Sequence, residues 1–562
     1  MDIIIIDKKA SSNFINVSLK KNFIKKKKIQ IIKFGNQTID KNYNILDLSS
    51  LIYKTYREKI KFIKIKITKF LQGKPEYIDY KLFELNYADD IWQIFYLVNS
   101  IKKIKNLNKI YVISKYEKTL LLDAIKQYFP NKLGKFIQVR GYYVLNNKTK
   151  IKLMFLSNLF NSFMCSILYF FVKLKKYDLI KNLYFAHFPN HWDISNSKYK
   201  ILGNYSKENF FLISILRNNS NLFNNFNNFF LSLKLKKINA IFLESFLNPI
   251  EILGIYFSSL KIKKDKKIKY LLKQIGLDFA FEEISLNYKY LEYTRNKTLR
   301  KSLKKICLKY KFKKIIYPFF EFLDGKILSS FFNQRVIKTY SLQHAYLPKH
   351  LFSRFFDSAE ILYNSSNQLF LPKHILLEQT KHIQNFYKLK KIKKKCVGAM
   401  RYSNLNIINS KKTNNYLLLM DLHNKDYLID QINNFFPENI RFYVRPHPLY
   451  KKHFEKLSLN KNVFFDNELS VRSSIKKNNI GKVITTNYTS SFIDILNSNL
   501  VITILNVKNF MRDDKELKKY FPVINSLAEL NLKNFSNSNN KLSNFISYYG
   551  NTSITKFKKY IN

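Results

Sequence analysis

The sequence predicts an α/β protein built on mainly parallel sheets. Short runs rich in β-branched residues alternate along the chain with longer stretches of helical periodicity, which is the pattern of βα units. The chain has 562 residues, of which 46% are hydrophobic and 16% aromatic, so it can fill large cores. These observations favour a globular protein with more than one domain.

The N-terminal half contains several expected strands. Residues 1–7 form an apolar run without the basic region and small-residue cleavage site of an export signal, so they predict a first buried strand. A strand at 109–114 precedes a helix at 117–129. Another strand, at 183–186, runs into a loop that contains His187, His191, Trp192 and Asp193. His191 and Trp192 suit contact with a sugar ring of an acceptor, and a packed loop is the alternative.

Residues 153–172 carry no charge over a length that would cross a membrane, and lysines flank them. Their serine and asparagine residues lower the hydropathy. We therefore expect a buried or interfacial helix whose flanking lysines rest on anionic headgroups, with a membrane span as the alternative.

Two further strands precede polar residues. A strand at 314–318 is followed by Glu321, a candidate general base, although an exposed loop carboxylate is the plainer interpretation. A strand at 336–342 ends at Gln343 and His344. The lysine-dense segment 387–395 predicts a linker. Beyond it, five short strands predict a second Rossmann-like domain, at 416–420, 442–444, 463–465, 483–485 and 501–505. The expected organisation is an N-terminal Rossmann-like acceptor domain with helical insertions at 1–386, the linker, a nucleotide-donor domain at 396–545 and a tail at 546–562.

The charge balance is strongly basic, with 98 Lys and Arg against 39 Asp and Glu, a formal net charge of +59. Such a charge is typical of proteins that bind nucleic acid or anionic membranes. The abundance of Lys, Asn, Ile, Phe and Tyr, all with A/T-rich codons, offers another explanation. Because Arg clusters, RNP-like aromatics and zinc-finger spacing are missing from the sequence, we expect no nucleic-acid partner.

The sequence offers no pattern for a disulfide framework or a bound metal. Its three cysteines, Cys165, Cys307 and Cys396, lie far apart without a C-x-x-C pair, which favours reduced thiols in the cytoplasm. The acidic pairs 89–90 and 513–514 lack the spacing of an Asp-x-Asp metal motif. We therefore expect no metal and no other cofactor.

Residues 445–448 form the motif Arg-Pro-His-Pro directly after a hydrophobic strand. The prolines fix the backbone around His447, which can donate to a phosphate or stabilise a departing one. Arg445 lies on the same side of an extended strand, where it serves as a bidentate phosphate partner or as a structural brace. A buried structural histidine is the alternative for His447.

A second motif follows the strand at 482–486. Thr489, Ser490 and Ser491 fit the start of a helix, where free backbone N–H groups and the helix dipole favour an anion. Asp494 lies one turn further on the same face, where its carboxylate can accept hydrogen bonds from a ribose. An ordinary N-cap is the alternative. Ligands of open α/β sheets bind at the carboxyl ends of strands, so both motifs are predicted to face one crevice.

Four motifs together resemble bacterial surface-polysaccharide transferases: Gln343-His344-Ala345, residues 397–402, residues 445–448 and residues 489–494. Over about residues 310 to 530 the chain is similar to GT-B-like surface carbohydrate biosynthesis proteins, among them capsule Kdo-transferases, bacterial polysialyltransferases and CDP-glycerol glycerophosphotransferases. The resemblance implies two Rossmann-like domains that face a central cleft. It also implies donor phosphate and sugar contacts for His447, Thr489, Ser490, Ser491 and Asp494, and a cleft position for Gln343 and His344. Ala345, Asp494 and Asn499 depart from the Gly, Glu and Gly usual in these families.

The predicted function is transfer of a sugar from a nucleotide-activated donor, a CMP-sugar or another NDP-sugar, to a surface polysaccharide or its lipid-linked precursor. His447 neutralises the leaving phosphate, and His344 or Glu321 takes the proton of the acceptor hydroxyl. The expected location is the cytoplasm, peripheral to the inner face of the membrane. Two alternatives stay open: a CDP-glycerol-type polyol-phosphate transferase, and a non-enzymatic basic protein that binds membranes or nucleic acid. The donor, the acceptor, the stereochemical outcome, the identity of the base and the oligomeric state are not predicted.

Overall fold

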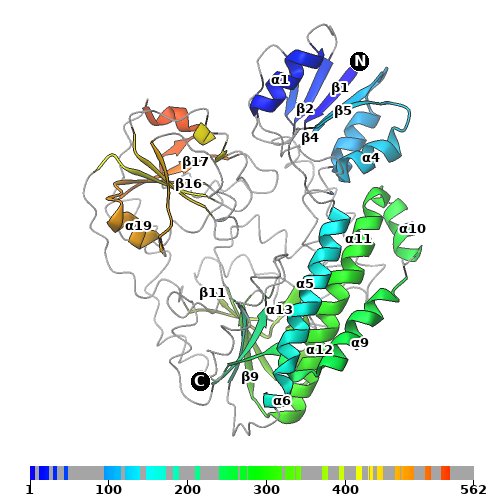
Figure 1. The fold of residues 1–562 in the computed structure, drawn as a ribbon, viewed down its shortest axis with the longest axis vertical. Helices are drawn as coiled ribbons and strands as arrows, with labels where there is room; N and C mark the ends of the chain where they lie inside the picture. The colour runs from blue at the N-terminus through cyan, green and yellow to red at the C-terminus, as the bar shows by residue number, and fades with distance from the viewer. Residues whose placement is uncertain are drawn as a thin grey trace.

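The structure of the chain is a computed structural model that contains three parallel sheets (Figure 1). It describes residues 1–6, 12–23, 29–33, 39, 43–47, 91, 94–114, 120–138, 147–172, 182–188, 209–215, 240–263, 266–274, 276–318, 320, 323–335, 337–343, 370–377, 392–397, 413–420, 428–429, 431–433, 440–446, 462–468, 470–486, 500–507 and 521–531.

The first sheet has the strand order β3-β2-β1-β4-β5, and all its pairs are parallel. Its strands are β1 (Asp2–Ile6), β2 (Ile29–Lys33), β3 (Asn44–Asp47), β4 (Ile110–Ser114) and β5 (Leu133–Gln138). The isoleucines of β1 alternate between two cores, as side chains of a strand must. Ile3 and Ile5 pack with α4 (Leu120–Tyr128), whereas Ile4 and Ile6 pack with α1 (Ser12–Phe23). A central strand buried on both faces explains the uninterrupted apolar run at the N-terminus.

The second sheet has the order β12-β11-β10-β9-β6-β7-β8, again with parallel pairs. Its strands are β6 (Asn182–Phe188), β7 (Asn209–Ile215), β8 (Ala240–Phe242), β9 (Lys314–Pro318), β10 (Lys338–Leu342), β11 (His374–Leu377) and β12 (Lys393–Cys396). Helix α13 (Leu323–Asn333) connects β9 to β10.

Two features of this region differ from the sequence-based expectation. The N-terminal half carries two parallel sheets, where one Rossmann-like unit with insertions is predicted. Residues 393–395 of the expected linker belong to β12, the edge strand that pairs with β11. Lysine-rich edge strands resist pairing with other chains, so the lysine density reflects a protected edge as well as a connection. The remaining domain bounds stay predictions.

A layer of helices runs from the second sheet to the first, and the core of the first sheet includes Leu272, Leu277, Phe279 and Phe281 of this layer (Figure 1). Helices α5 (Asn147–Ile167) and α6 (Tyr169–Val172) precede β6. Between β8 and β9 lie η2 (Leu243–Phe246), α9 (Pro249–Leu260), α10 (Lys266–Gln274), η3 (Asp278–Ala280), α11 (Phe281–Asn287), the π-helical turn η4 (Tyr288–Glu292) and α12 (Tyr293–Lys309). Helix α5 confirms the helix expected around 153–172. Within the part of the chain that the structure describes, no helix is long and apolar enough to cross a membrane.

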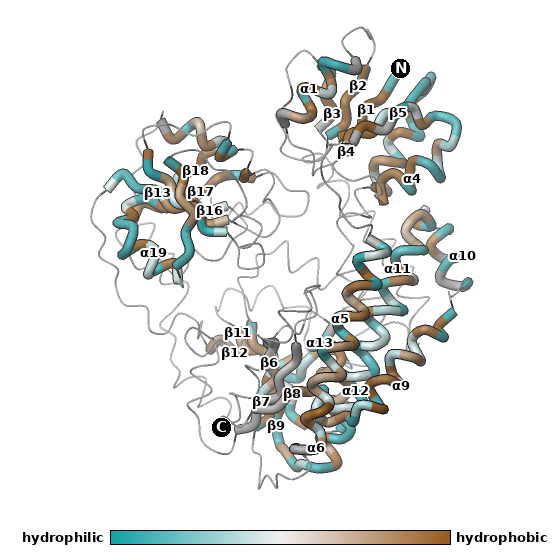
Figure 2. Tube along the Cα trace, in the orientation of Figure 1, coloured by the Kyte–Doolittle hydropathy of each residue, from teal (hydrophilic) through white to brown (hydrophobic). Residues whose placement is uncertain are grey.

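The third sheet has the order β15-β14-β13-β16-β17-β18. Its elements are β13 (Tyr416–Leu419), β14 (Phe442–Arg445), β15 (Val463–Phe465), α19 (Val471–Lys477), β16 (Lys482–Thr486), β17 (Val501–Leu505), β18 (Val523–Ile524) and η9 (Leu527–Asn531). The five strands predicted for this region are all present, and β18 adds a short sixth. Hydrophobic residues colour the strands brown in Figure 2, in keeping with a core shared by β13, β14, β16 and β17.

In each sheet the strand order reverses once, between β1 and β4, between β6 and β9, and between β13 and β16. This doubly wound order is the Rossmann-like arrangement, whose ligands bind outside the carboxyl ends of the strands at the reversal. The predicted α/β class with Rossmann-like sheets is therefore confirmed.

Candidate functional site

The motif at 445–448 and the motif at 489–494, both predicted to bind donor phosphate, follow strands that end at the same level of the third sheet. Leu419 of β13 pairs with Arg445 of β14 on one side and with Thr485 of β16 on the other. His447 comes two residues after Arg445, and Thr489 comes four residues after Thr485. The reversal of strand order lies between β13 and β16, which is where ligands of such sheets bind. Both motifs therefore follow strands whose carboxyl ends meet at one edge of the sheet.

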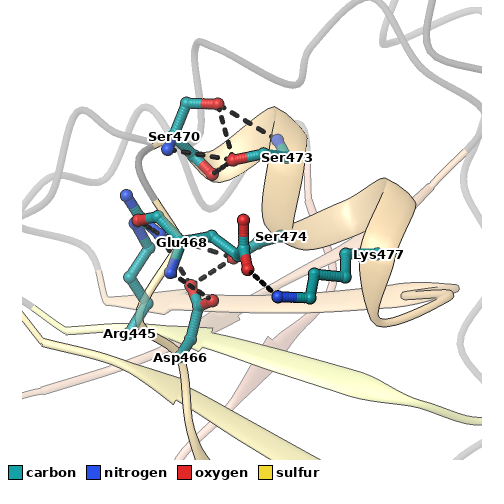
Figure 3. Close-up of polar contacts among 7 residues, drawn as sticks. All are labelled: Arg445, Asp466, Glu468, Ser470, Ser473, Ser474 and Lys477. Carbon is teal, nitrogen blue, oxygen red and sulfur yellow. Dashed lines mark hydrogen bonds and ion pairs between the residues drawn. The ribbon is translucent and has the colours of Figure 1, made fainter.

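Arg445 holds the end of β14 to the loop after β15. Its Nη1 donates to Oδ2 of Asp466 at 2.7 Å, to the carbonyl oxygen of Glu468 at 2.9 Å and to Oγ of Ser474 at 3.4 Å (Figure 3). Of the two roles considered for this arginine, these contacts make it a structural brace. A contact between Arg445 and donor phosphate stays a prediction.

Asp466 is the buried centre of this arrangement, and its side chain has no solvent exposure. Besides Arg445, it accepts hydrogen bonds from the backbone N–H of Glu468 at 3.2 Å and from the hydroxyl of Ser474. Its own backbone N–H donates to the carbonyl oxygen of Val444 at 2.9 Å. Buried carboxylates are tolerated where several donors satisfy them, so this set fixes the position of β14 immediately before the motif.

Helix α19 begins with a capping box that stabilises the same loop. The backbone N–H of Ser473 donates to Oγ of Ser470 at 3.0 Å, and the N–H of Ser470 donates to Oγ of Ser473 at 3.0 Å. Lys477 and Glu468 form an exposed ion pair at 2.6 Å (Figure 3). The braced loop, with Asp466 and Ser474, is the element that sequence reasoning missed. Its signals were a carboxylate directly after a strand and two serines at capping-box spacing.

The candidate acceptor residues follow three adjacent strands of the second sheet. His191 and Trp192 come after β6, Glu321 comes after β9, and His344 comes after β10. The order β10-β9-β6 makes these strands neighbours, and the reversal of strand order lies between β6 and β9. The carboxyl ends of these strands form the edge where a ligand of a Rossmann-like sheet binds, and the placement of the four residues beyond them stays a prediction.

Buried polar contacts hold β9 and β10 in register near that edge. The hydroxyl of Ser341 donates to the carbonyl oxygen of Tyr317 at 3.0 Å, and the Tyr317 hydroxyl contacts Ser329 of α13. Burial raises the pKa of Tyr317 far above its ordinary value, so this phenol stays neutral. The backbone N–H of Gln343 continues the ladder to Leu376 at 2.9 Å. Gln343 itself is buried, directly before His344.

A buried ion pair joins the helical layer to α13. Nε of Arg295 donates to Oδ1 of Asp324 at 2.7 Å, and Nη2 contacts Oδ2 of the same carboxylate. Oε1 of Glu244 lies 3.7 Å from Nη1. Burial alone lowers the pKa of Arg295, but the two carboxylates outweigh it and raise that pKa, so the guanidinium stays charged. Helix α13 begins two residues after Glu321, so this pair anchors a helix close in sequence to a predicted site residue.

Most predicted site residues lie outside the described part of the chain. This holds for His447, His344, Glu321, Thr489, Ser490, Ser491, Asp494, His191 and Trp192, whereas Arg445 is described. Their roles stay predictions, and the strands that precede them are established. Across the described ranges, no group of three or more His, Cys, Asp or Glu side chains is placed to hold a metal ion. All three cysteines are free.

Comparison with solved structures finds glycosyltransferases. The calicheamicin glycosyltransferase CalG4 has a TM-score of 0.40 and 9% identity, over 68% of this chain and 98% of that chain. SnogD from Streptomyces nogalater has a TM-score of 0.38 and 6% identity, over 68% of this chain and 99% of that chain. The wall teichoic acid polymerase TagF has a TM-score of 0.30 and 13% identity, over 75% of this chain and 96% of that chain.

At the level of sequence, no family model matches the chain, and comparison with curated proteins finds no relative.

Proposed function

We propose that this protein is a glycosyltransferase that moves a sugar from a nucleotide-activated donor to a bacterial surface polysaccharide or its lipid-linked precursor. The observation that carries the proposal is the register of the third sheet, in which Arg445 and Thr485 both pair with Leu419. This register starts the His447 motif and the Thr489–Ser491 motif from one edge, beside the reversal of strand order.

In the proposed reaction, an acceptor hydroxyl attacks the anomeric carbon of the donor sugar. The new bond joins the acceptor oxygen to that carbon, and the bond between the carbon and the donor phosphate oxygen breaks. His447 donates to the departing phosphate, and the N–H and hydroxyl groups at 489–491 stabilise its charge. The acceptor proton passes to His344 or Glu321. The scheme requires no metal from the protein.

The brace around Arg445 suits this scheme because a leaving-group donor must be held firmly. Transition-state stabilisation depends on donors that are already in place before the charge develops. Arg445, Asp466 and Ser474 fix the strand end, and buried Pro446 extends this rigid segment to the residue before His447.

Nucleotide binding tests the proposal before either substrate is known. CMP, CDP, UDP and GDP are screened for thermal stabilisation of the intact protein, since a ligand of the native state stabilises it by about 2.7 kcal/mol at about one hundred times its Kd. We expect nucleotides with one of these nucleobases to raise the melting temperature of the wild-type protein. The shift should decrease in His447→Ala and Ser490→Ala and persist in His382→Ala, a control histidine outside the motifs.

The transferred group decides between the two reaction classes. Once the nucleotide is identified, its sugar conjugates and CDP-glycerol are offered with a surface-glycan acceptor, and the product is analysed by mass spectrometry. Incorporation of a sugar supports the proposal. Transfer of glycerol phosphate alone would replace it with the polyol-phosphate reaction, in which the acceptor attacks phosphorus.

A further inference from the structure

Helix α9 is hydrophobic on the side that faces away from the core as well as on the side that faces it. Its inner side buries Ile252, Ile255, Tyr256 and Ser259. Its outer side carries Ile250, Leu253, Gly254, Phe257 and Leu260 at helical spacing, and these five residues are the α9 face. Ile250 is 79% exposed and Phe257 is 59% exposed. A helix that faces water normally places polar residues there, so the α9 face calls for a partner.

The neighbouring helix α5 also exposes large apolar side chains. The two helices pack through Phe155 and Tyr256, whose ring centroids lie 5.2 Å apart, and the hydroxyls of Ser162 and Tyr256 lie 3.2 Å apart. Polar residues of α5 are buried, whereas Leu153 and Leu156 are exposed. The buried polar residues are Ser157, Asn158, Asn161, Ser162 and Ser166. Helix α5 therefore buries polar side chains beside apolar ones such as Phe155, and it exposes two leucines.

Exposed large hydrophobic residues concentrate in the helical layer. Within the described ranges there are eleven in total, and eight of them belong to α5, α6, α9, α10 or α12. In Figure 2 the tube of α9 shows long brown stretches on the outside of the molecule. Scattered single hydrophobics need no explanation, but Ile250, Phe257 and Leu260 share one helix face, and a face of this kind marks an interaction surface.

The surroundings of the α9 face are positively charged. Lys261 and Lys263 follow the helix and are exposed. Helix α12, which packs beside α9, contains seven Lys or Arg residues and no acidic residue. The one acidic residue of α9, Glu251, lies 3.3 Å from Lys301 and also contacts Lys305. Among the described residues of α9 and α12, the apolar face is therefore bordered by cations, and the one carboxylate, that of Glu251, is paired with lysines.

This combination selects an anionic lipid surface over a second copy of the chain. Two copies that met at the α9 face would bring lysines against lysines, in a protein of net charge +59. Anionic headgroups instead pair with the lysines while the apolar side chains enter the headgroup–acyl boundary. We propose that the α9 face docks this protein on an anionic bilayer. This proposal rests on the proposed function, because a protein docked on a bilayer would meet an acceptor that is attached to the membrane.

Vesicle flotation tests the docking surface without nucleotide or acceptor. The full-length protein is mixed with vesicles of phosphatidylcholine alone or with phosphatidylglycerol added, at low salt and at about 0.5 M salt, where charges are screened beyond about 4 Å. We expect Ile250→Asp/Phe257→Asp to weaken binding to the anionic vesicles by about tenfold or more. The matched control is Val17→Asp, at a position 57% exposed on α1, which should bind as the wild-type protein does.

A gain of binding gives the complementary test. Gly254 is exposed, and a Cβ added there meets no atom within 4 Å, so a side chain at this position starts in open space. Gly254→Leu should bind the anionic vesicles more tightly by about threefold or more, because it adds apolar surface to the face. Gly254→Ser, which adds a polar group of small size, should not.

Two results would overturn the proposal. One is equal vesicle binding by the wild-type protein and the Ile250→Asp/Phe257→Asp variant at both salt concentrations, which would assign binding to net charge alone. The other is a lipid-free dimer in sedimentation experiments that the same variant dissociates, which would assign the face to a second copy. The nucleotide-induced thermal shift of the variant, expected to match wild type, separates a failure here from a failure of the proposed function.

Discussion

Arg445 lies with its Nη1 2.7 Å from Oδ2 of Asp466, and this ion pair joins the carboxyl end of β14 to the loop that leads into α19. The Asp466 side chain is fully buried and the Arg445 side chain is 18% exposed, so solvent screens the pair little. The next residue along the chain is buried Pro446, and His447 follows. The pair therefore fixes the strand end that precedes His447, the predicted donor to the leaving group.

Removal of the carboxylate should destabilise the third sheet strongly. Asp466→Ala leaves a half-buried guanidinium without its charged partner, and breaking a buried pair in this way costs about 3–5 kcal/mol. Urea unfolding of the full chain measures the loss. Glu468→Gln is the control, because its exposed pair with Lys477 contributes at most about 1 kcal/mol. Similar small losses in both variants would show that the Arg445–Asp466 pair is not a brace.

The exposed glycine of α9 should be replaceable with a gain in stability. Gly254→Ala places a methyl group where no atom lies within 4 Å and reduces the conformational entropy of the unfolded chain. We expect a stabilisation of about 0.5–1 kcal/mol, read from thermal or urea unfolding. Gly276→Ala is the opposite control, since its backbone φ of +74° disfavours a side chain, and it should destabilise. The same sign in both variants would contradict the account.

The stability of the second sheet should depend on the protonation of His374. This imidazole stacks on Tyr340 with ring centroids 4.4 Å apart, and burial, reinforced by nearby Lys393, Lys338 and Lys373, lowers its pKa. The unfolded chain, with an ordinary histidine pKa, then binds the proton first as the pH falls. His374 thus contributes stability above about pH 6.5 that is lost as the pH falls below it. Urea unfolding between about pH 7.5 and about pH 5 should show a smaller decline in His374→Phe, and identical slopes would refute the assignment.

Much of the third sheet could be predicted from the sequence because its strands are short, apolar and bounded by turns. The apolar strands that end at Arg445 and Thr486 could be predicted without tertiary information. Strand direction then predicts which edge of a parallel sheet binds ligands. The Arg445 brace could not be chosen from two possible roles, since its partner Asp466 lies 21 residues away along the chain. A contact between residues so far apart in sequence forms only when β14 and β15 pair, so sequence patterns do not predict it.

The rest depended on packing that periodicity does not report. The lysines of β12 led to the prediction of a linker, because edge strands and linkers are both rich in polar residues. The uncharged run of α5 predicted a helix, but the burial of its serines and asparagines and the exposure of Leu156 are set by contacts with α9. The extra N-terminal sheet was missed since β2 and β3 are brief strands without motifs.

The rate of sugar transfer by His447→Ala tests the central claim most directly. With the donor identified by the nucleotide screen, single-turnover transfer is measured for the wild-type protein, His447→Ala and the control His382→Ala, together with each melting temperature. Loss of a preorganised donor to the leaving phosphate should slow His447→Ala by about a hundredfold or more, with the melting temperature unchanged. Transfer by folded His447→Ala at the wild-type rate would contradict the account.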